Sequence, residues 1–393
     1  MKRFLIIYSL LFSFLLSGCK SIYNNFKEIE ELLVIQTMGL DNQGGGVLLS
    51  LASASGGGNK PRRLSSSGDS ITTAMERIYN YSYEEQLFLS HVGQLIIGED
   101  AAEKGIDDYL DYISRTPEMR LDMPMFIVRD GTAADAVMQV GDGRRGISEV
   151  LESVETSSAH RGDSGIYTAT DVLRDLMRWG SALVCALECT EASESSDNGN
   201  SPYTSTQDER SAEEKQNLTA AALGYAVIRE GKLCRYLDRE QAIAVGFLRN
   251  NTGISDVQVY DRHGDLVVLE IDSGGSRIQS RWSSPGQLAA LDIHITVQAS
   301  VIEISGGGEL QNAEYTDHLT AELEELLASY VSDTLKISKD LKSDFLGLAS
   351  AVENHSPENY RLMSRDFPDI LPELEFKVSV SGHLRHTNDM RDS

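Results

Sequence analysis

The residue with the most specific chemical signal is Cys19, which ends the string Leu16-Ser17-Gly18-Cys19. A basic start and an apolar stretch over residues 4–16 precede it, which is the layout of a secretory signal. That stretch is too short to cross a hydrocarbon core as a helix, which needs about 20 apolar residues. A thiol directly after small residues resembles the bacterial lipobox, in which the Cys becomes the new N-terminus and carries a thioether-linked diacylglycerol. The sequence therefore predicts a signal peptide over residues 1–18 and a lipid on Cys19.

Lipidation at this position would tether the mature chain by its first residue. Each methylene of an acyl chain buried in the membrane contributes roughly 0.8 kcal/mol to binding. Two or more chains therefore hold a protein on the membrane stably, whereas a single chain does not. We therefore expect the 375 residues after the signal to be anchored by the lipid and otherwise exposed to water. An ordinary signal peptide with an incidental Cys is the alternative, and the position of Cys19 at the end of the apolar stretch argues against it.

Three other strings contain residue types that perform catalysis or bind ligands. Gly162-Asp163-Ser164-Gly165 is similar to the nucleophile loop of chymotrypsin-like proteases, but no base or orienting acid accompanies it. His383 and His386 lack a carboxylate or Cys at metal-ligand spacing. The glycine-rich string over residues 56–61 lacks the spacing and the Ser/Thr of a phosphate-binding loop. We therefore predict a protein that is not an enzyme and that uses no catalytic residues, metal or cofactor.

The remaining cysteines do not indicate a disulfide framework. With Cys19 lipidated, Cys185, Cys189 and Cys234 are left, and an odd number cannot be fully paired within one chain. Cys185 and Cys189 are one helical turn apart beside apolar neighbours, so we expect buried thiols there. A metal or redox pair is the alternative for these two positions.

The net charge restricts the partners of the protein. It is −25 for the whole chain and becomes −27 once Lys2 and Arg3 leave with the signal. Nucleic acid is a poor partner for such a chain, because its phosphates are bound by Lys and Arg. Anionic headgroups should also repel the protein, so the lipid must hold it on the membrane. No later stretch of the sequence is long and apolar enough to span a bilayer.

The first part of the mature chain, residues 19–189, has the pattern of an α/β region with room for two subdomains. Apolar runs over 31–41 and 47–54 predict a β-hairpin across a glycine turn. Strands and helices then alternate, which favours a mixed sheet with helices packed on it. The predicted strands cover 90–98 and 123–129, and the predicted helices begin near residues 71, 100, 132 and 169, the second with Asp100 and Glu103 as a capping box and the third capped by Thr132 with Asp135.

Residues 190–217 are expected to be a flexible, solvated linker. The run 190–214 holds seven acidic residues against one Arg, diluted with Ser, Asn and Gly. Such a composition cannot bury enough apolar surface to order itself. We assign its charge to solvation rather than to a binding site.

Residues 218–393 are expected to form a C-terminal α+β domain. It opens with two strands around a turn at 230–232 and a helix that Asp238 and Gln241 cap. A long helix over 316–342 carries apolar residues at helical spacing, and a last alternating strand over 374–380 follows it. The predicted fold class is therefore α+β and multi-domain, with mixed sheets, packed helices and a long helix followed by a closing strand.

Three separated strings, in order along the mature chain, resemble the spore germinant-receptor C-subunit family, the Ger(x)C lipoproteins of endospore formers. The first is the lipobox followed by the strand end Gly39-Leu40-Asp41, and the second extends from His91 to Asp122 and ends Arg115-Thr116-Pro117-Glu118-Met119-Arg120-Leu121-Asp122. The third starts at Leu223 and continues to Asp344-Phe345-Leu346-Gly347-Leu348. Lys20 replaces the Trp that usually follows the lipid-bearing Cys, which affects subfamily placement more than family membership.

The resemblance implies a non-enzymatic subunit anchored on the outer face of the spore inner membrane. Such proteins sense nutrient germinants together with a membrane-embedded A subunit and a permease-like B subunit. The resemblance carries over no catalytic residue, and only Cys19 has a defined chemical role. A solute-binding lipoprotein of an import system is the alternative function.

The run from Arg115 to Asp122 is a candidate surface for a partner, because charged residues interrupt a helix end that Pro117 breaks. An internal salt bridge from Arg120 or Asp122 would explain the same charges. Both interpretations remain open at the level of the sequence.

Overall fold

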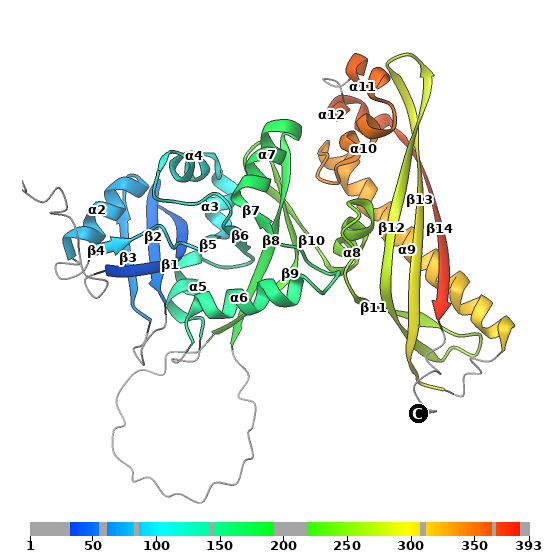
Figure 1. Cartoon of the computed structure of the whole chain (residues 1–393), viewed down its shortest axis with the longest axis horizontal. Coiled ribbons are helices and arrows are strands. Elements are labelled where there is room, and N and C mark those ends of the chain that lie inside the picture. The colour runs from blue at the N-terminus through cyan, green and yellow to red at the C-terminus, as the bar shows by residue number, and fades with distance from the viewer. Residues whose placement is uncertain are drawn as a thin grey trace, which may run out of the picture.

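The computed structural model describes residues 32–54, 61–81, 86–141, 145–191, 218–306, 312–363 and 367–385. Within these ranges the chain forms two β-sheets, a larger one from β1 to β10 and a smaller one from β11 to β14 (Figure 1). Helices pack on both sheets, so the predicted α+β fold with mixed sheets is confirmed. The signal peptide, Cys19 and all but the first two residues of the predicted linker lie outside the described residues.

The larger sheet has the order β10-β9-β8-β6-β5-β1-β2-β3, with β4 beside β1 and β7 beside β6. The pairs β1–β5, β5–β6 and β6–β8 are parallel, whereas the outer pairs are antiparallel. The predicted hairpin is confirmed as β1 and β2. The strands are β1 (Leu32–Gln43), β2 (Gly46–Ser53), β3 (Arg63–Gly68), β4 (Gln86–Phe88), β5 (Gln94–Ile97), β6 (Pro124–Val128), β7 (Tyr167–Thr168), β8 (Ser181–Glu191), β9 (Leu218–Arg229) and β10 (Lys232–Leu237).

Each face of the larger sheet has its own layer of helices. Successive side chains of a strand point to opposite faces, and in β6 Met125 and Ile127 enter one core while Phe126 and Val128 enter the other. One core includes residues of α2 (Ile71–Tyr81), α3 (Glu99–Lys104), α4 (Asp107–Arg115) and α7 (Ala169–Trp179), and the opposite core includes residues of α5 (Ala133–Gln139) and α6 (Ile147–Ser158).

Two of the three predicted capping pairs are confirmed. The Thr132 hydroxyl accepts a hydrogen bond from the N–H of Asp135, and Asp238 forms a capping box with Gln241. The prediction for Asp100 and Glu103 is wrong, because the N-cap is Gly98, two residues before Asp100, and no side chain caps the helix. The predicted single helix is also two helices, since Gly105 at a φ of 139° ends α3 before α4 begins.

The smaller sheet has the order β11-β12-β13-β14, and its last strand is parallel to β13. The predicted long helix followed by a closing strand is confirmed as α9 and β14 (Figure 1). The elements are α8 (Arg239–Leu248), β11 (Ser255–Tyr260), β12 (Leu266–Ser284), β13 (Gln287–Ile304), α9 (Ala313–Leu341), α10 (Leu348–His355), α11 (Pro357–Met363), α12 (Phe367–Ile370), η3 (Leu371–Glu373) and β14 (Glu375–Arg385).

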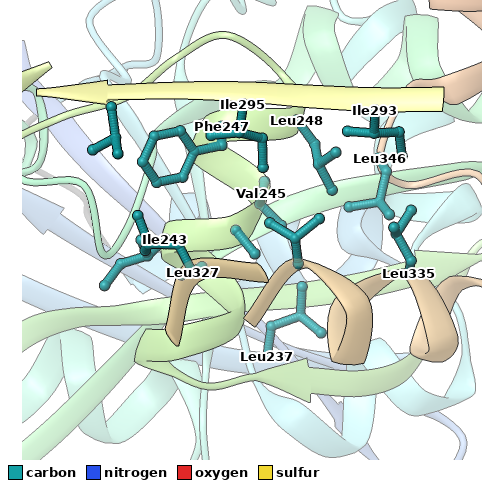
Figure 2. Close-up of a cluster of buried hydrophobic side chains, with 14 of the residues drawn as sticks. Leu237, Ile243, Val245, Phe247, Leu248, Ile293, Ile295, Leu327, Leu335 and Leu346 are labelled. Atoms are coloured by element: carbon teal, nitrogen blue, oxygen red, sulfur yellow. The ribbon is translucent and has the colours of Figure 1, made fainter. Parts of the chain in front are cut away.

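One continuous apolar core joins the smaller sheet to the larger one. Its centre is α8, whose side chains lie between β13 and α9, with Phe247 and Ile243 near Ile295 and Leu327 (Figure 2). Buried side chains of the larger sheet belong to the same core: Leu183 of β8, Tyr225 and Val227 of β9, and Leu237 of β10. No water-filled layer therefore separates these parts of the two sheets.

The strands of residues 218–237 do not belong to the smaller sheet, although the sequence placed them in the C-terminal domain. β9 pairs with β8 over almost its whole length, and β10 pairs with β9. The residues on either side of the expected linker are therefore neighbouring strands of one sheet. The reason is that both strands are apolar on the face toward the shared core, so pairing buries them.

A buried aspartate connects β1 of the larger sheet to α5. The Asp41 carboxylate at the end of β1 accepts hydrogen bonds from the N–H groups of Ala133 and Ala134, both at 2.8 Å, at the start of α5. Burial raises the pKa of Asp41, and the two N–H groups lower it. Gly98 contributes the space for this contact, because a Cβ on Gly98 would lie 1.9 Å from Asp41 Oδ1.

Gly98→Ala is predicted to destabilise the protein by about 1–3 kcal/mol, because the added methyl group must displace the Asp41 carboxylate. Urea unfolding of the variant would measure this loss. Gly93→Ala is the matched control, since its Cβ would meet nothing closer than 3.8 Å and the change should stay within about 0.5 kcal/mol. Equal effects of the two substitutions would contradict this account of Gly98.

Candidate functional site

The protease-like string has a structural arrangement rather than a catalytic one. The Ser164 hydroxyl is buried and donates to the hydroxyl of Ser158 at 3.1 Å. The Asp163 carboxylate pairs with Arg161 and lies 3.5 Å from Nε of Arg239. Neither group is oriented by a histidine in these contacts, so the string provides no activated nucleophile.

The thiols singled out by the sequence lie on strands, whereas His386 and most of the glycine-rich string 56–61 lie outside the described residues. Cys185 is fully buried on β8, and burial raises the pKa of its thiol to about 12. Cys189 is half-buried, and burial raises the pKa of its thiol to about 11, so neither thiol is reactive near neutral pH. The buried position of Cys185 is confirmed, but on a strand and not on a helix. Among the described residues no three His, Cys, Asp or Glu side chains are placed to hold a metal ion.

The charged side chains of the run Arg115–Asp122 are exposed, whereas Met119 is buried, and both arginines are paired locally. Arg115 pairs with Asp111 one helical turn away, at 2.8 Å, and Arg120 pairs with Asp122. The internal salt bridge that the sequence left open is therefore present. Exposed pairs of this kind contribute little to stability, about 0–1 kcal/mol.

A cleft of about 650 Å³ lies between the β1–β2 turn, the start of α2, and α4. Its two cations are already bound within the protein: Lys104 to Asp100 and Asn42, and Arg115 to Asp111. The cleft therefore offers no free cation for an anionic ligand.

A network of polar contacts lies between the two sheets, around the side chain of Arg249 directly after α8. This side chain is only 15% exposed, and its guanidinium donates to the Phe345 carbonyl oxygen at 2.7 and 3.0 Å. It also donates to the Asp175 carboxylate of α7 at 3.2 Å from both terminal nitrogens. Its carbon Cζ lies 5.3 Å from the centre of the Tyr167 ring. One side chain thus contacts α7, β7 and the segment before α10.

Electrostatics keep this arginine charged despite its burial. Burial alone would lower the pKa of the Arg249 guanidinium, but Tyr167 and Asp175 raise it above its ordinary value. A buried cation is tolerated only when it is paired and hydrogen-bonded. Asp175 and the Phe345 carbonyl supply these partners, so the junction can hold the two sheets in one orientation.

Asp344 completes the junction from the side of the smaller sheet. Its buried carboxylate accepts hydrogen bonds from the N–H groups of Leu348 at 2.7 Å and Ala349 at 2.8 Å, at the start of α10. Burial raises the pKa of Asp344 to about 7, while these N–H groups and the Arg249 guanidinium lower it and Asp175 raises it further. A carboxyl that gains and loses a proton near neutral pH therefore lies beside a buried arginine.

Two further contacts cross the same junction at its rim. Arg178 of α7 pairs with Glu353 of α10, and Arg229 of β9 donates to the Leu341 carbonyl oxygen at 2.8 Å. These contacts join residues 112 or more positions apart in the sequence. The junction is therefore a non-local feature built from both halves of the chain.

Comparisons with known proteins identify the two halves. A family model described as the spore germination protein N-terminal domain matches residues 25–188, and one described as spore germination B3/GerAC like, C-terminal, matches residues 223–388. The chain belongs to the GerAC-like family of spore germination proteins. Spore germination protein KC of Bacillus subtilis (strain 168) is 21% identical over 413 residues, which cover 98% of this chain and 96% of that protein.

A solved structure agrees with the fold of this GerAC-like chain. The crystal structure of the GerBC protein superposes with a TM-score of 0.53 at 15% identity, and the match covers 88% of this chain and 96% of that one. No helix in the parts of the chain listed above is long and apolar enough to cross a membrane.

The strings that carried the family resemblance contain two of the buried aspartates of this GerAC-like protein, Asp41 and Asp344. Asp41 ends the first string and holds the start of α5, and Asp344 begins the last string and holds the start of α10. Arg249 was not among the residues predicted from the sequence. The signal in the sequence was the apolar run Ala242–Leu248 at the end of a predicted helix, followed directly by an arginine. A charge at such a buried position needs a partner of opposite charge or a hydrogen-bond acceptor.

The raised pKa of Asp344 predicts that the protein loses stability as the pH rises from about 4 to 7. The unfolded chain releases this proton near the ordinary value of 3.8, whereas the folded chain keeps it until about pH 7. The folded state therefore binds more protons in that window, and this group lowers the free energy of unfolding by up to about 1.4 kcal/mol per pH unit.

Urea unfolding between pH 4.5 and 7 would measure this slope for the parent protein and for Asp344→Asn. Asp344→Asn should reduce the slope of the free energy of unfolding against pH. Asp333→Asn, on the exposed side of α9, should leave this slope unchanged. Identical slopes for the parent protein and Asp344→Asn would contradict the assignment.

Proposed function

We propose that this protein is the lipid-anchored, non-catalytic C subunit of a nutrient germinant receptor, which acts in spore germination with membrane-embedded A and B subunits. The observation that carries the proposal is the ordered match of both family domains to residues 25–188 and 223–388, directly after the lipobox. A relative described as a spore germination protein, aligned over nearly its whole length, supports it.

The proposed anchor is the lipid on Cys19, which would place the chain on the outer face of the spore inner membrane. The mature chain carries a charge of −27 and would be repelled by anionic headgroups. Acyl chains are then the attractive contribution that holds the protein at the surface. The A and B subunits would supply the membrane-spanning part of the receptor.

A non-catalytic role is supported by what the reactive-looking residues do. Ser164 and Asp163 are occupied by structural hydrogen bonds, and Cys185 is a buried thiol with a raised pKa. The polar side chains at the junction are also used within the protein, where they hold α7 against α10. We therefore assign the protein a role in assembly or signalling within the receptor.

Cys19→Ala is predicted to remove the lipid and weaken germination while leaving the described fold intact, because residue 19 lies outside it. Labelling with radioactive palmitate and fractionation of spore membranes would measure the first effect, and the response of spores to nutrients would measure the second. Cys234→Ala is the matched control, since it removes an exposed thiol of the folded part.

Three outcomes would contradict the proposal. Label retained in the Cys19→Ala protein would place the lipid elsewhere, and full germination with unlipidated protein would make the tether dispensable. Spores that lack the gene and still respond normally to every nutrient, with no sister receptor compensating, would contradict the receptor role itself. Tight binding of a small molecule by the purified protein would instead favour a solute-binding lipoprotein.

A further inference from the structure

An apolar groove opens on the larger sheet next to the point where the described chain begins. It has a volume of about 320 Å³ and is lined by Met75 and Tyr79 of α2, Leu89 after β4, Tyr112 of α4 and Pro117. We call it the α2 groove. Met75 and Leu89 are buried at its floor, whereas Tyr79 is 40% exposed, so a large aromatic side chain stands open on its wall.

The chain enters the fold beside this groove. β1 starts at Leu32, which pairs in parallel with Gln86 of β4, and Leu89 follows three residues later on the same path. At about 3.3 Å per residue, Leu89 is roughly 10 Å further along the strand direction than Leu32. Twelve residues, Lys20 to Glu31, connect Leu32 to the lipid-bearing Cys19, and they can span roughly 40 Å when extended. The connecting segment is therefore long enough to reach the groove.

The segment also has the chemistry that the groove would accept. Ile22, Phe26 and Ile29 recur at spacings of four and three, which place apolar side chains on one face of a helix. Lys27 and Glu28 follow Phe26, so the charges of residues 22–29 balance and the apolar side chains are what the groove would accept. The N-terminal family model starts at residue 25, so its pattern includes Phe26 and Ile29 although the first strand begins only at residue 32.

From these observations we infer that residues 22–29 dock in the α2 groove, with Phe26 against Tyr79. The inference rests on the proposed lipid anchor for its functional meaning. A docked segment would leave only a few residues between the lipid and the folded domain. It would hold the larger sheet close to the membrane in one orientation, where a free segment would let it rotate and drift.

A disulfide test addresses the contact directly in the full-length chain purified from membranes in detergent, with Cys234 replaced by Ser. Phe26→Cys combined with Tyr79→Cys should link under mild oxidation at least about tenfold faster than Phe26→Cys combined with Met177→Cys, because docking raises the effective concentration of the two thiols. Met177 is 86% exposed on α7, so a thiol at this position is accessible without docking. Equal rates for the two pairs would overturn the inference, as would links formed only between chains.

Hydrogen exchange gives a readout without engineered thiols. Phe26→Asp should speed exchange in the peptide over α2 by about fivefold or more and leave α9 unchanged, because only the docked face is lost. Asn25→Asp adds the same charge beside the apolar face and should have no effect on α2. Unchanged exchange in Phe26→Asp would overturn the inference. Neither readout depends on the lipid, so the two proposals can be tested separately. Docking can be contradicted while Cys19 labelling and germination are as expected, and the lipid anchor can be contradicted while docking is observed.

Discussion

The contact between the two sheets depends on how the charge of one buried arginine, Arg249, is compensated. Arg249 follows the buried apolar residues 242–248 of α8, and its side chain is only 15% exposed, so most of its charge is removed from water. The protein satisfies it with the Asp175 carboxylate from one half of the chain and the Phe345 carbonyl oxygen from the other. Removing one partner of such a buried pair costs about 3–5 kcal/mol, since the remaining charge is left without compensation.

In each half of the molecule, a buried aspartate accepts hydrogen bonds from the first N–H groups of a helix. Asp41 holds the start of α5 against the larger sheet, and Asp344 holds the start of α10 at the junction. Both lie in strings that carried the family resemblance, so the features that the sequence offered as family signals are structural ones. The result is a scaffold with fixed internal orientation, which agrees with the role in assembly or signalling that we propose.

Local patterns in the sequence predicted much of the fold. Period-two and helical spacing located the first hairpin, α7, α9 and β14, and side-chain chemistry located the caps at Thr132 and Asp238. The pairing of β8 with β9 across the acidic run was missed, because composition suggested a boundary between domains while pairing depends on residues far apart in the chain. The junction was missed for the same reason, since Asp175, Arg249 and Phe345 meet only in the folded protein.

The central claim is that the two sheets share one core and one junction and so unfold as a single unit. Differential scanning calorimetry of the full mature protein tests it most directly. We expect one transition in the unmodified protein, with a ratio of van't Hoff to calorimetric enthalpy of about 1. Arg249→Ala should show a second, separate transition, and Arg174→Ala, whose side chain is 55% exposed, should not. Two well-separated transitions in the unmodified protein would contradict the claim.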